Sequence, residues 1–377
     1  MTRRIIYVSG TRADFGLMRS TLQKIAADPG LDIAVCVTGM HLSERYGMTI
    51  TEIESAGLPI CARIVVACDA TTGAEMARSI GSEIVGMVDC FAREQPDAVL
   101  VLGDRGEMLA GAITALHLNL ALVHIHGGER SGSVDEPMRH AISKLAHYHL
   151  VATDQSRDRL IRMGEPGERI FVTGAPGLDG LTDHLEVDRA ILCRAARLNP
   201  DRAVALLVFH PVVQQAAKAR EQIQTIVSAV RAEGFQIVAL LPNADAGGNE
   251  IREVLEGAAR EPGIAVAVHF ERSVFVSWMA TADVMIGNSS SGIIEAATLG
   301  VPVVNVGDRQ MRRERNANVM DVPVEAESIR LALRNARQGN VFPKRNIYGE
   351  GLAGGRIVDL LKRLPLDISM LDKTNAY

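Results

Sequence analysis

The chain has 377 residues, more than one hydrophobic core usually spans, so we expect two domains. Hydrophobic residues make up 47% and charged residues 23%, as in an ordinary globular protein, and a formal net charge of -5 gives no electrostatic reason to expect a nucleic-acid partner. No apolar run reaches the ~20 residues of a membrane helix, and no secretory leader is recognisable. We therefore expect a cytoplasmic protein without a membrane or nucleic-acid partner.

Apolar runs typical of parallel strands alternate with helical patterns along the first half of the chain. We predict strands at residues 5–8, 33–37, 98–102, 121–125, 148–152 and 170–173, with a helix at 106–116. This alternation favours a doubly wound, Rossmann-like α/β domain over residues 1–185.

The alternation restarts after a glycine- and proline-containing break at 174–177 and a polar helical stretch. Strands are predicted at 203–209, 236–241, 265–269, 284–286 and 301–306, which gives a second Rossmann-like domain over 186–377. A last helix at 356–364 can pack back on the first domain. The predicted fold class is thus α/β with two doubly wound domains and a cleft between them.

The first loop, Gly10-Thr-Arg-Ala-Asp-Phe-Gly16, follows a strand and opens a helix. Backbone amides at a helix N-terminus, together with Arg12, suit an anion. The loop lacks the Gly-x-Gly-x-x-Gly spacing of a dinucleotide site. An ordinary turn with a surface arginine is the alternative.

Acidic, basic and histidine residues follow two neighbouring strands between residues 98 and 135. Asp104 and Arg105 come after the first strand, and His126-Gly-Gly-Glu129 after the second. Asp135 is placed to cap the next helix. Taken singly, the acids are ordinary turn and capping residues, but ligands bind at the carboxyl ends of parallel strands. Their occurrence on consecutive loops predicts an active site.

The second half carries a serine-rich loop, Gly287-Asn-Ser-Ser-Ser-Gly292, between a strand and a helix that contains Glu295. This layout suits a diphosphate on the backbone amides and a ribose on the carboxylate, with a serine-rich helix cap as the alternative. His210 and Asn243 follow other strands and are expected to line the same cleft. Arg309 can grip a phosphate, although arginine clusters are usually solvated.

Other site chemistries have little support. His124 and His126 have no third ligand at metal-site spacing, so we predict no metal. No Gly-x-Ser-x-Gly elbow accompanies Ser131 and His140. The cysteines are expected to be buried free thiols: Cys36, Cys61, Cys68, Cys90 and Cys193.

Motifs in family order give a specific resemblance over nearly the whole chain: GTRADFG, TGMHLSERYG, GDR-x-E, H-x-x-GGE-x-SG-x-x-D, FHP, GNSSSG-x-x-E and RQ-x-x-RE. The chain resembles the hydrolysing UDP-N-acetylglucosamine 2-epimerases of bacterial sialic acid biosynthesis, related to the epimerase half of the mammalian bifunctional enzyme. The resemblance implies the two-domain glycosyltransferase-B architecture, no cofactor, and a homodimer or homotetramer. It also implies a UDP-sugar site made by Arg12, His41, Arg105, His210, Asn243, Ser289, Ser290, Ser291, Gly292, Glu295 and Arg309.

The implied reaction removes the C2 proton of UDP-N-acetylglucosamine and expels UDP by anti elimination. Water then adds to the 2-acetamidoglucal with inversion at C2, which releases N-acetylmannosamine. Asp104 and Asp135 match family acids assigned to proton transfer. His126 stands where some relatives carry a catalytic glutamate, and imidazole can take over that role, with Glu129 as a neighbouring candidate.

Alternatives remain open at this point. The same chemistry on UDP-2,4-diacetamido-2,4,6-trideoxyglucose, a legionaminic acid precursor, requires a more apolar sugar pocket, and Leu102 and Gly106 are positions where that pocket can differ from those of relatives. A glycosyltransferase of the same architecture needs no acceptor for a C2 proton. A non-catalytic UDP-sugar-binding protein is suggested by His126.

Overall fold

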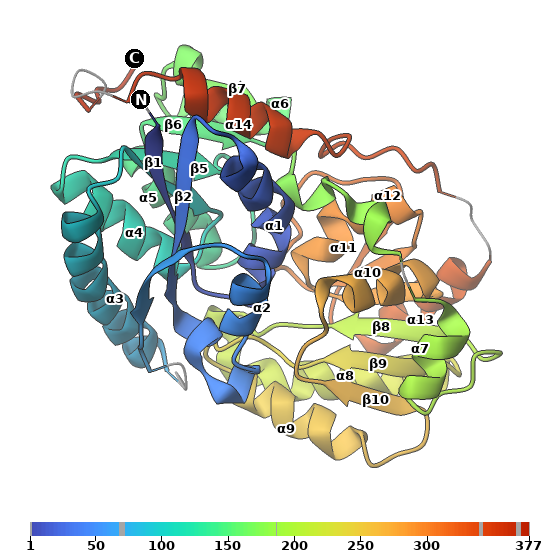
Figure 1. Ribbon diagram of the computed structural model, residues 1–377. Helices are drawn as coiled ribbons and strands as arrows, with labels where there is room; N and C mark the ends of the chain where they lie inside the picture. Colours follow the sequence, from blue (N-terminus) through green and yellow to red (C-terminus); the bar gives the residue numbers. More distant parts are fainter. Residues whose placement is uncertain (1, 68–71, 186, 339–341, 367–370, 377) are drawn as a thin grey trace.

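The computed structural model describes residues 2–67, 72–185, 187–338, 342–366 and 371–376. Over these residues the chain forms two parallel sheets, a seven-stranded sheet in the order β3-β2-β1-β4-β5-β6-β7 and a six-stranded sheet in the order β10-β9-β8-β11-β12-β13. Helices cover both faces of each sheet (Figure 1). The predicted fold class of two doubly wound α/β domains is confirmed.

The first sheet is built from short strands rich in Val, Ile and Leu, and β4 and β5 are buried at every position. Its strands are β1 (Arg3–Ser9), β2 (Leu31–Thr38), β3 (Ile60–Ile64), β4 (Ala98–Leu102), β5 (Ala121–Ile125), β6 (Tyr148–Val151) and β7 (Ile170–Val172). One face packs on α1 (Arg12–Ala27), α2 (Ile50–Ser55) and α14 (Ala353–Arg363). The other packs on α3 (Gly73–Glu94), α4 (Gly106–His117) and α5 (Asp135–Leu145), and α6 (Asp154–Arg162) covers β6 and β7.

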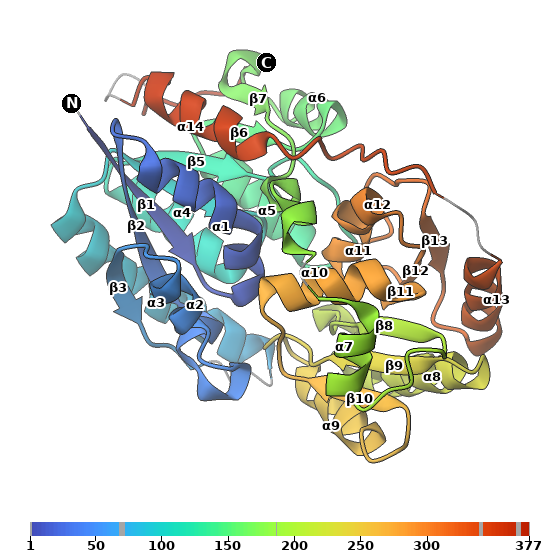
Figure 2. The ribbon, with the colours of Figure 1, turned by 45° about the vertical axis from the view of Figure 1, so that its right-hand side comes forward.

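The second sheet consists of β8 (Val204–Val208), β9 (Gln236–Leu240), β10 (Ile264–Ala267), β11 (Val284–Gly287), β12 (Val303–Val306) and β13 (Val319–Val322). One face is covered by α8 (Ala219–Ala232), α9 (Gly248–Ala258) and α13 (Ala326–Arg337). The opposite face is covered by α7 (Arg189–Ala195), α10 (Arg272–Thr281) and α12 (Ala296–Leu299), and α11 (Ser290–Ile294) faces the first domain (Figure 2).

Two strands were missing from the sequence prediction, and both lie at sheet edges. β3 is half-buried and carries Arg63, and β13 carries the exposed Asp321. An edge strand needs no continuous apolar run because solvent reaches one side of it. The apolar-run criterion therefore finds the central strands and the edge strands β7 and β10, and misses these two.

The last helix returns to the first domain, where α14 lies beside α1 in both views (Figures 1 and 2). Ile357 and Leu361 are fully buried in the core that α1 shares with the first sheet. The carboxylate of Asp179 accepts the amides of Ala353 and Gly354, each at 2.8 Å, and so fixes the start of α14. The division at residues 185 and 186 stays a prediction.

The thiol prediction needs one correction. Cys36, Cys90 and Cys193 are buried, but Cys61 on the edge strand β3 is half-buried, and Cys68 lies outside the described residues. Among the helices that the structure describes, none combines the length and apolarity needed to cross a membrane.

Candidate active site

A cleft with a cavity of about 210 Å³ lies where the carboxyl ends of the two sheets face each other. Its polar lining comes from both domains: Thr11, Arg12, Asp14, Tyr46, Thr49, Asp104, Arg105, His126, Asp135, Arg139, His210, Asn243, His269, Ser289, Ser290, Arg309 and Arg313. The cleft thus combines several guanidinium groups with three aspartates and three histidines.

Several contacts join the two domains across the cleft, and three of them involve Arg105 or Arg309. Arg105 Nη2 lies 3.4 Å from Asp245 Oδ1, and Arg309 Nη2 lies 3.4 Å from Asp135 Oδ2. The amide of Gly132 donates to the Arg309 carbonyl at 2.9 Å. The molecule is therefore in a closed arrangement.

Helix α1 presents Arg12 to the cleft through a capping box. Thr11 accepts the amide of Asp14 and the Asp14 carboxylate accepts the amide of Thr11, at 3.2 and 2.6 Å. Arg12, the first residue of the helix, donates to the Phe270 carbonyl of the second domain. Burial lowers the pKa of Arg12, and the negative charge of Glu52 offsets only part of that shift. A largely desolvated cation thus stands at the domain boundary.

Asp104 and Asp135 each pair with an arginine. Asp104 follows β4 and pairs with Arg139 of α5. Asp135 is the first residue of α5 rather than its N-cap, which is Val134, so the predicted capping role is wrong. The side chain of Asp135 instead reaches Arg309 of the other domain. Each of these two carboxyl groups therefore lies beside a guanidinium group.

His126 follows β5 in the left-handed backbone region, with a φ of 63°. Its Nδ1 lies 2.5 Å from Oε1 of Glu129, whose Oε2 binds Arg139 at 3.0 Å and also Arg313. Burial, followed by the charge of Arg313, lowers the pKa of His126 to about 3. Its Nε2 has no hydrogen-bond partner among the described residues. A neutral imidazole therefore lines the cleft, with the Glu129 carboxylate beside its Nδ1.

The serine-rich loop follows β11 and needs its first glycine. Gly287 has a φ of 133°, and a Cβ there would lie 2.0 Å from the Val208 carbonyl oxygen. Ser289 caps α11, and Arg309 Nη1 donates to the Asn288 carbonyl at 3.1 Å. Ser289 and Ser290 line the cleft. Ser291 and Gly292 are not among the lining residues; the Ser291 hydroxyl contacts the Ser289 hydroxyl, and Gly292 packs near Val303.

His210 and Asn243 stand beside this loop. The backbone amide of His210 donates to Asn288 Oδ1 at 2.7 Å, and the backbone amide of Asn243 donates to His210 Nδ1 at 3.3 Å. Asn243 Nδ2 donates to Asp245 Oδ2 at 2.7 Å. Burial, with help from Arg309, lowers the pKa of His210 to about 3, so this imidazole is neutral as well.

Three more predicted site residues, besides Ser291 and Gly292, are absent from the cleft lining. His41 is fully buried, with Nε2 2.9 Å from Ser9 Oγ and Nδ1 2.8 Å from Thr49 Oγ1. Glu295 is buried against Arg272, and Glu129 is buried among the cations described above. The structure therefore gives these three side chains supporting contacts and no place on the cleft surface.

Sequence reasoning missed two arginines that line the cleft, Arg139 and Arg313, and the aspartate that pairs with Arg105, Asp245. Arg139 follows Asp135 by four residues in one helix, which places both on one face and could have identified it. Arg313 belongs to a cluster whose members the sequence cannot rank. No group of three or more His, Cys, Asp or Glu side chains in the described part of the chain suits a metal ion.

Two Rossmann-like domains around such a cleft define an enzyme of the glycosyltransferase-B architectural class. In line with this, the solved structure of UDP-GlcNAc 2-epimerase from Neisseria meningitidis bound to UDP-GlcNAc matches with a TM-score of 0.81 and 19% identity, over 95% of this chain and 99% of that one. At this identity the match shows the fold alone.

The family follows from sequence. The family model described as UDP-N-acetylglucosamine 2-epimerase matches residues 23–362. A UDP-N,N'-diacetylbacillosamine 2-epimerase (hydrolyzing) of Legionella pneumophila is 48% identical over 100% of both chains. A UDP-N-acetylglucosamine 2-epimerase of Neisseria meningitidis is 33% identical over 93% of this chain and 91% of that protein. The chain belongs to the UDP-N-acetylglucosamine 2-epimerase family, as the resemblance predicted, and is a hydrolysing 2-epimerase of UDP-sugars.

Proposed function

We propose that the substrate is UDP-2,4-diacetamido-2,4,6-trideoxyglucose, the UDP-N,N'-diacetylbacillosamine of the Legionella relative's name. The 48% identity along the whole of both chains is the observation that carries this choice. It reverses the order expected from sequence, in which UDP-N-acetylglucosamine came first. That sugar remains the second candidate, supported by the 33% identity to the Neisseria enzyme.

The nucleotide would lie on the second domain, with its diphosphate against Ser289 and Ser290. Arg12 and Arg309 enter the cleft beside this loop and would neutralise the phosphate charge. Departure of UDP transfers the electrons of the C1–O bond to a phosphate oxygen, so preorganised cations lower the cost of that step.

The sugar would lie against Asp104, His126 and Asp135. One of these groups accepts the C2 proton, the C2–H electrons form the C1–C2 double bond, and UDP leaves from C1. Water then adds its oxygen to C1 while C2 regains a proton on the opposite face. Epimerisation therefore needs proton-transfer groups on both faces of the ring, and we assign them to these three side chains.

Glu129 would act through His126. Its carboxylate lies 2.5 Å from the Nδ1 of that histidine and pairs with Arg139 and Arg313, so it orients the imidazole without reaching the sugar. The free Nε2 of His126 then replaces the carboxylate that some relatives carry at this position.

The test is proton NMR of the protein with each UDP-sugar in deuterated water. The expected products are UDP and a free 2,4-diacetamido-2,4,6-trideoxymannose that carries deuterium at C2. Turnover of UDP-N-acetylglucosamine with no reaction of the diacetamido sugar would reverse the ranking. Release of UDP without deuterium at C2 would point to a glycosyltransferase, and no reaction with either would favour a binding protein.

Asp104→Asn and Asp201→Asn form a matched pair for this assay. The first removes a cleft carboxylate, and we expect kcat to fall by about 10²–10⁴-fold, the usual contribution of a positioned acid or base. The second changes an exposed residue outside the cleft lining and is expected to leave turnover intact. Equal turnover in both variants would contradict the assignment of Asp104.

A further inference from the structure

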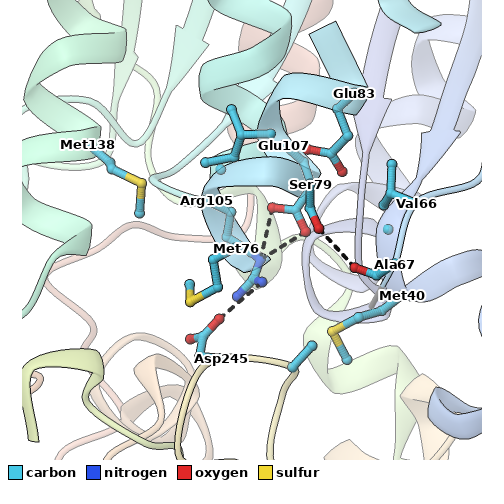
Figure 3. A pocket seen from close by; sticks show the side chains of 14 residues that line it. Met40, Val66, Ala67, Met76, Ser79, Glu83, Arg105, Glu107, Met138 and Asp245 are labelled. Carbon is cyan, nitrogen blue, oxygen red and sulfur yellow. Dashed lines mark hydrogen bonds and ion pairs between the residues drawn. The ribbon is translucent and has the colours of Figure 1, made fainter. Parts of the chain in front are cut away.

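A second cavity, of about 80 Å³, lies behind Arg105 on the side of α3. We call it the side chamber. Its apolar lining comes from segments far apart in the sequence: Met40, Val66, Met76, Ile80 and Met138. Figure 3 shows the Arg105 guanidinium within it, between the carboxylates of Glu107 and Asp245. The chamber therefore combines this apolar lining with the ionisable side chains of Glu83, Arg105, Glu107 and Asp245.

The side chamber adjoins the cleft. Met40 and Arg105 line both cavities, and Arg105 directly follows Asp104 in the chain. Arg105 Nε lies 3.2 Å from Glu107 Oε2, and Arg105 Nη2 lies 3.4 Å from Asp245 Oδ1. Burial lowers the pKa of Arg105, but the charges of Glu107 and Asp245 outweigh this and raise it overall. A permanently charged donor thus stands between the cleft and the chamber.

Gly106 keeps the chamber open. A Cβ at this position would lie 2.8 Å from Cγ1 of Ile80, closer than real Cβ atoms approach. A larger residue would force Ile80 to move and would occupy part of the space. Gly106 was one of two positions at which the sequence suggested a changed sugar pocket, and it lines this chamber.

The chamber matches an acetamido group in size and polarity. A single water needs about 10–15 Å³, so the cavity holds a group of several heavy atoms but no second sugar. The methyl group would contact the methionines, which adapt to irregular shapes. The amide carbonyl could accept from Arg105, and the amide N–H could donate to Glu107 or Asp245. With a sugar hydroxyl in place of the acetamido group, the apolar wall of the chamber would stay in contact with water.

We infer that the side chamber receives the C4 acetamido group of the substrate and selects for it. The inference rests on the proposed function and names the structural origin of its specificity. The C1 and C2 atoms must face the phosphate-binding and proton-transfer groups, and none of Arg12, Ser289 and Ser290 is among the described residues that line the chamber. C4 lies across the ring from C1, so its substituent points away from those groups.

Substitutions that fill or enlarge the chamber test this inference, with kinetics measured on UDP-2,4-diacetamido-2,4,6-trideoxyglucose. Met76 and Ile80 are half-buried on α3 and line the chamber, so Met76→Trp and Ile80→Trp fill its space. Loss of one well-fitted small group costs about 10–200-fold, and we expect kcat/KM to fall by that factor while the inhibition constant of UDP stays unchanged. Val85→Trp is the matched control, because Val85 on the same helix is 67% exposed.

A variant that enlarges the chamber tests which ring position of the sugar carries the group that the chamber receives. Met76→Ala is expected to improve turnover of an analogue with a butyramido group at C4, and to leave an analogue with that group at C2 unimproved. The inference fails if the tryptophan variants have the same kcat/KM as Val85→Trp, or if they weaken binding of UDP as much as they lower kcat/KM for the substrate. It also fails if Met76→Ala improves turnover of the C2 analogue. Absence of turnover by the unaltered protein would instead overturn the proposed function.

Discussion

Gly132 lies where the two domains touch, and replacing it by alanine tests the closed arrangement. A Cβ at Gly132 would lie 1.8 Å from the Asp308 carbonyl oxygen, whereas real Cβ atoms do not approach within 3.0 Å. The facing loop must therefore retreat by about 1.2 Å. Gly132 is not among the residues with positive φ, so alanine suits the local backbone and the clash is the only penalty.

The retreat would act on groups that line the cleft. It would stretch the hydrogen bond from the Gly132 amide to the Arg309 carbonyl, now 2.9 Å, and the pairing of Arg309 with Asp135, now 3.4 Å. A misplacement of about 1 Å can cost about 10²-fold in rate. We expect Gly132→Ala to lower kcat/KM by about that factor, with an unchanged melting temperature because the domains can separate without unfolding.

The assay is release of UDP from whichever UDP-sugar the protein turns over. Gly257→Ala in α9 is the control, since a Cβ there meets no atom within 4 Å. The steric argument would be refuted by a Gly132→Ala protein with the kcat/KM of that control. A large drop in melting temperature would also refute it, because the clash would then be absorbed inside a domain.

Three further predictions follow from single side chains. His126→Gln keeps hydrogen-bonding groups but cannot take up a proton, so we expect single-turnover rates to fall by about 10²–10⁴-fold with unchanged UDP affinity; an unimpaired rate would remove His126 from the mechanism. Ile357→Ala opens a cavity between α14 and α1, and urea unfolding should show a loss of about 2–5 kcal/mol in the free energy of unfolding. Leu352→Ala is the control, because Leu352 is 56% exposed and its replacement should change that free energy little. Burial, and then the charge of Glu107, raises the pKa of Glu83 to about 8. The folded state then keeps a proton that the unfolded state releases above about pH 4.3, so stability falls as pH rises towards 8. Relative to Glu83→Gln, the unaltered protein should lose up to about 1.4 kcal/mol per pH unit in that window, and a constant difference would contradict the shift.

The central part of the fold could be predicted from local pattern. The strands β4 and β5 are observed at the residues predicted for them, because a strand buried on both faces must be apolar throughout. The polar residues that follow, Asp104 and His126, line the cleft as expected, since parallel strands end at one edge of a sheet. The partly exposed β3 and β13 follow no such pattern.

The sequence by itself determined the two sheets, the loops that carry polar groups and, through motif order, the family. Only the tertiary structure decided which of those groups face the cleft and which charges pair. Glu129 and Arg313 are far apart in the chain and belong to different domains, and so do Arg105 and Asp245. Local periodicity sets which face of an element is buried, whereas ion-pair partners and cavities depend on how two finished domains approach each other. His41 shows the difference, because its motif predicted a sugar contact and packing placed it behind Ser9 and Thr49.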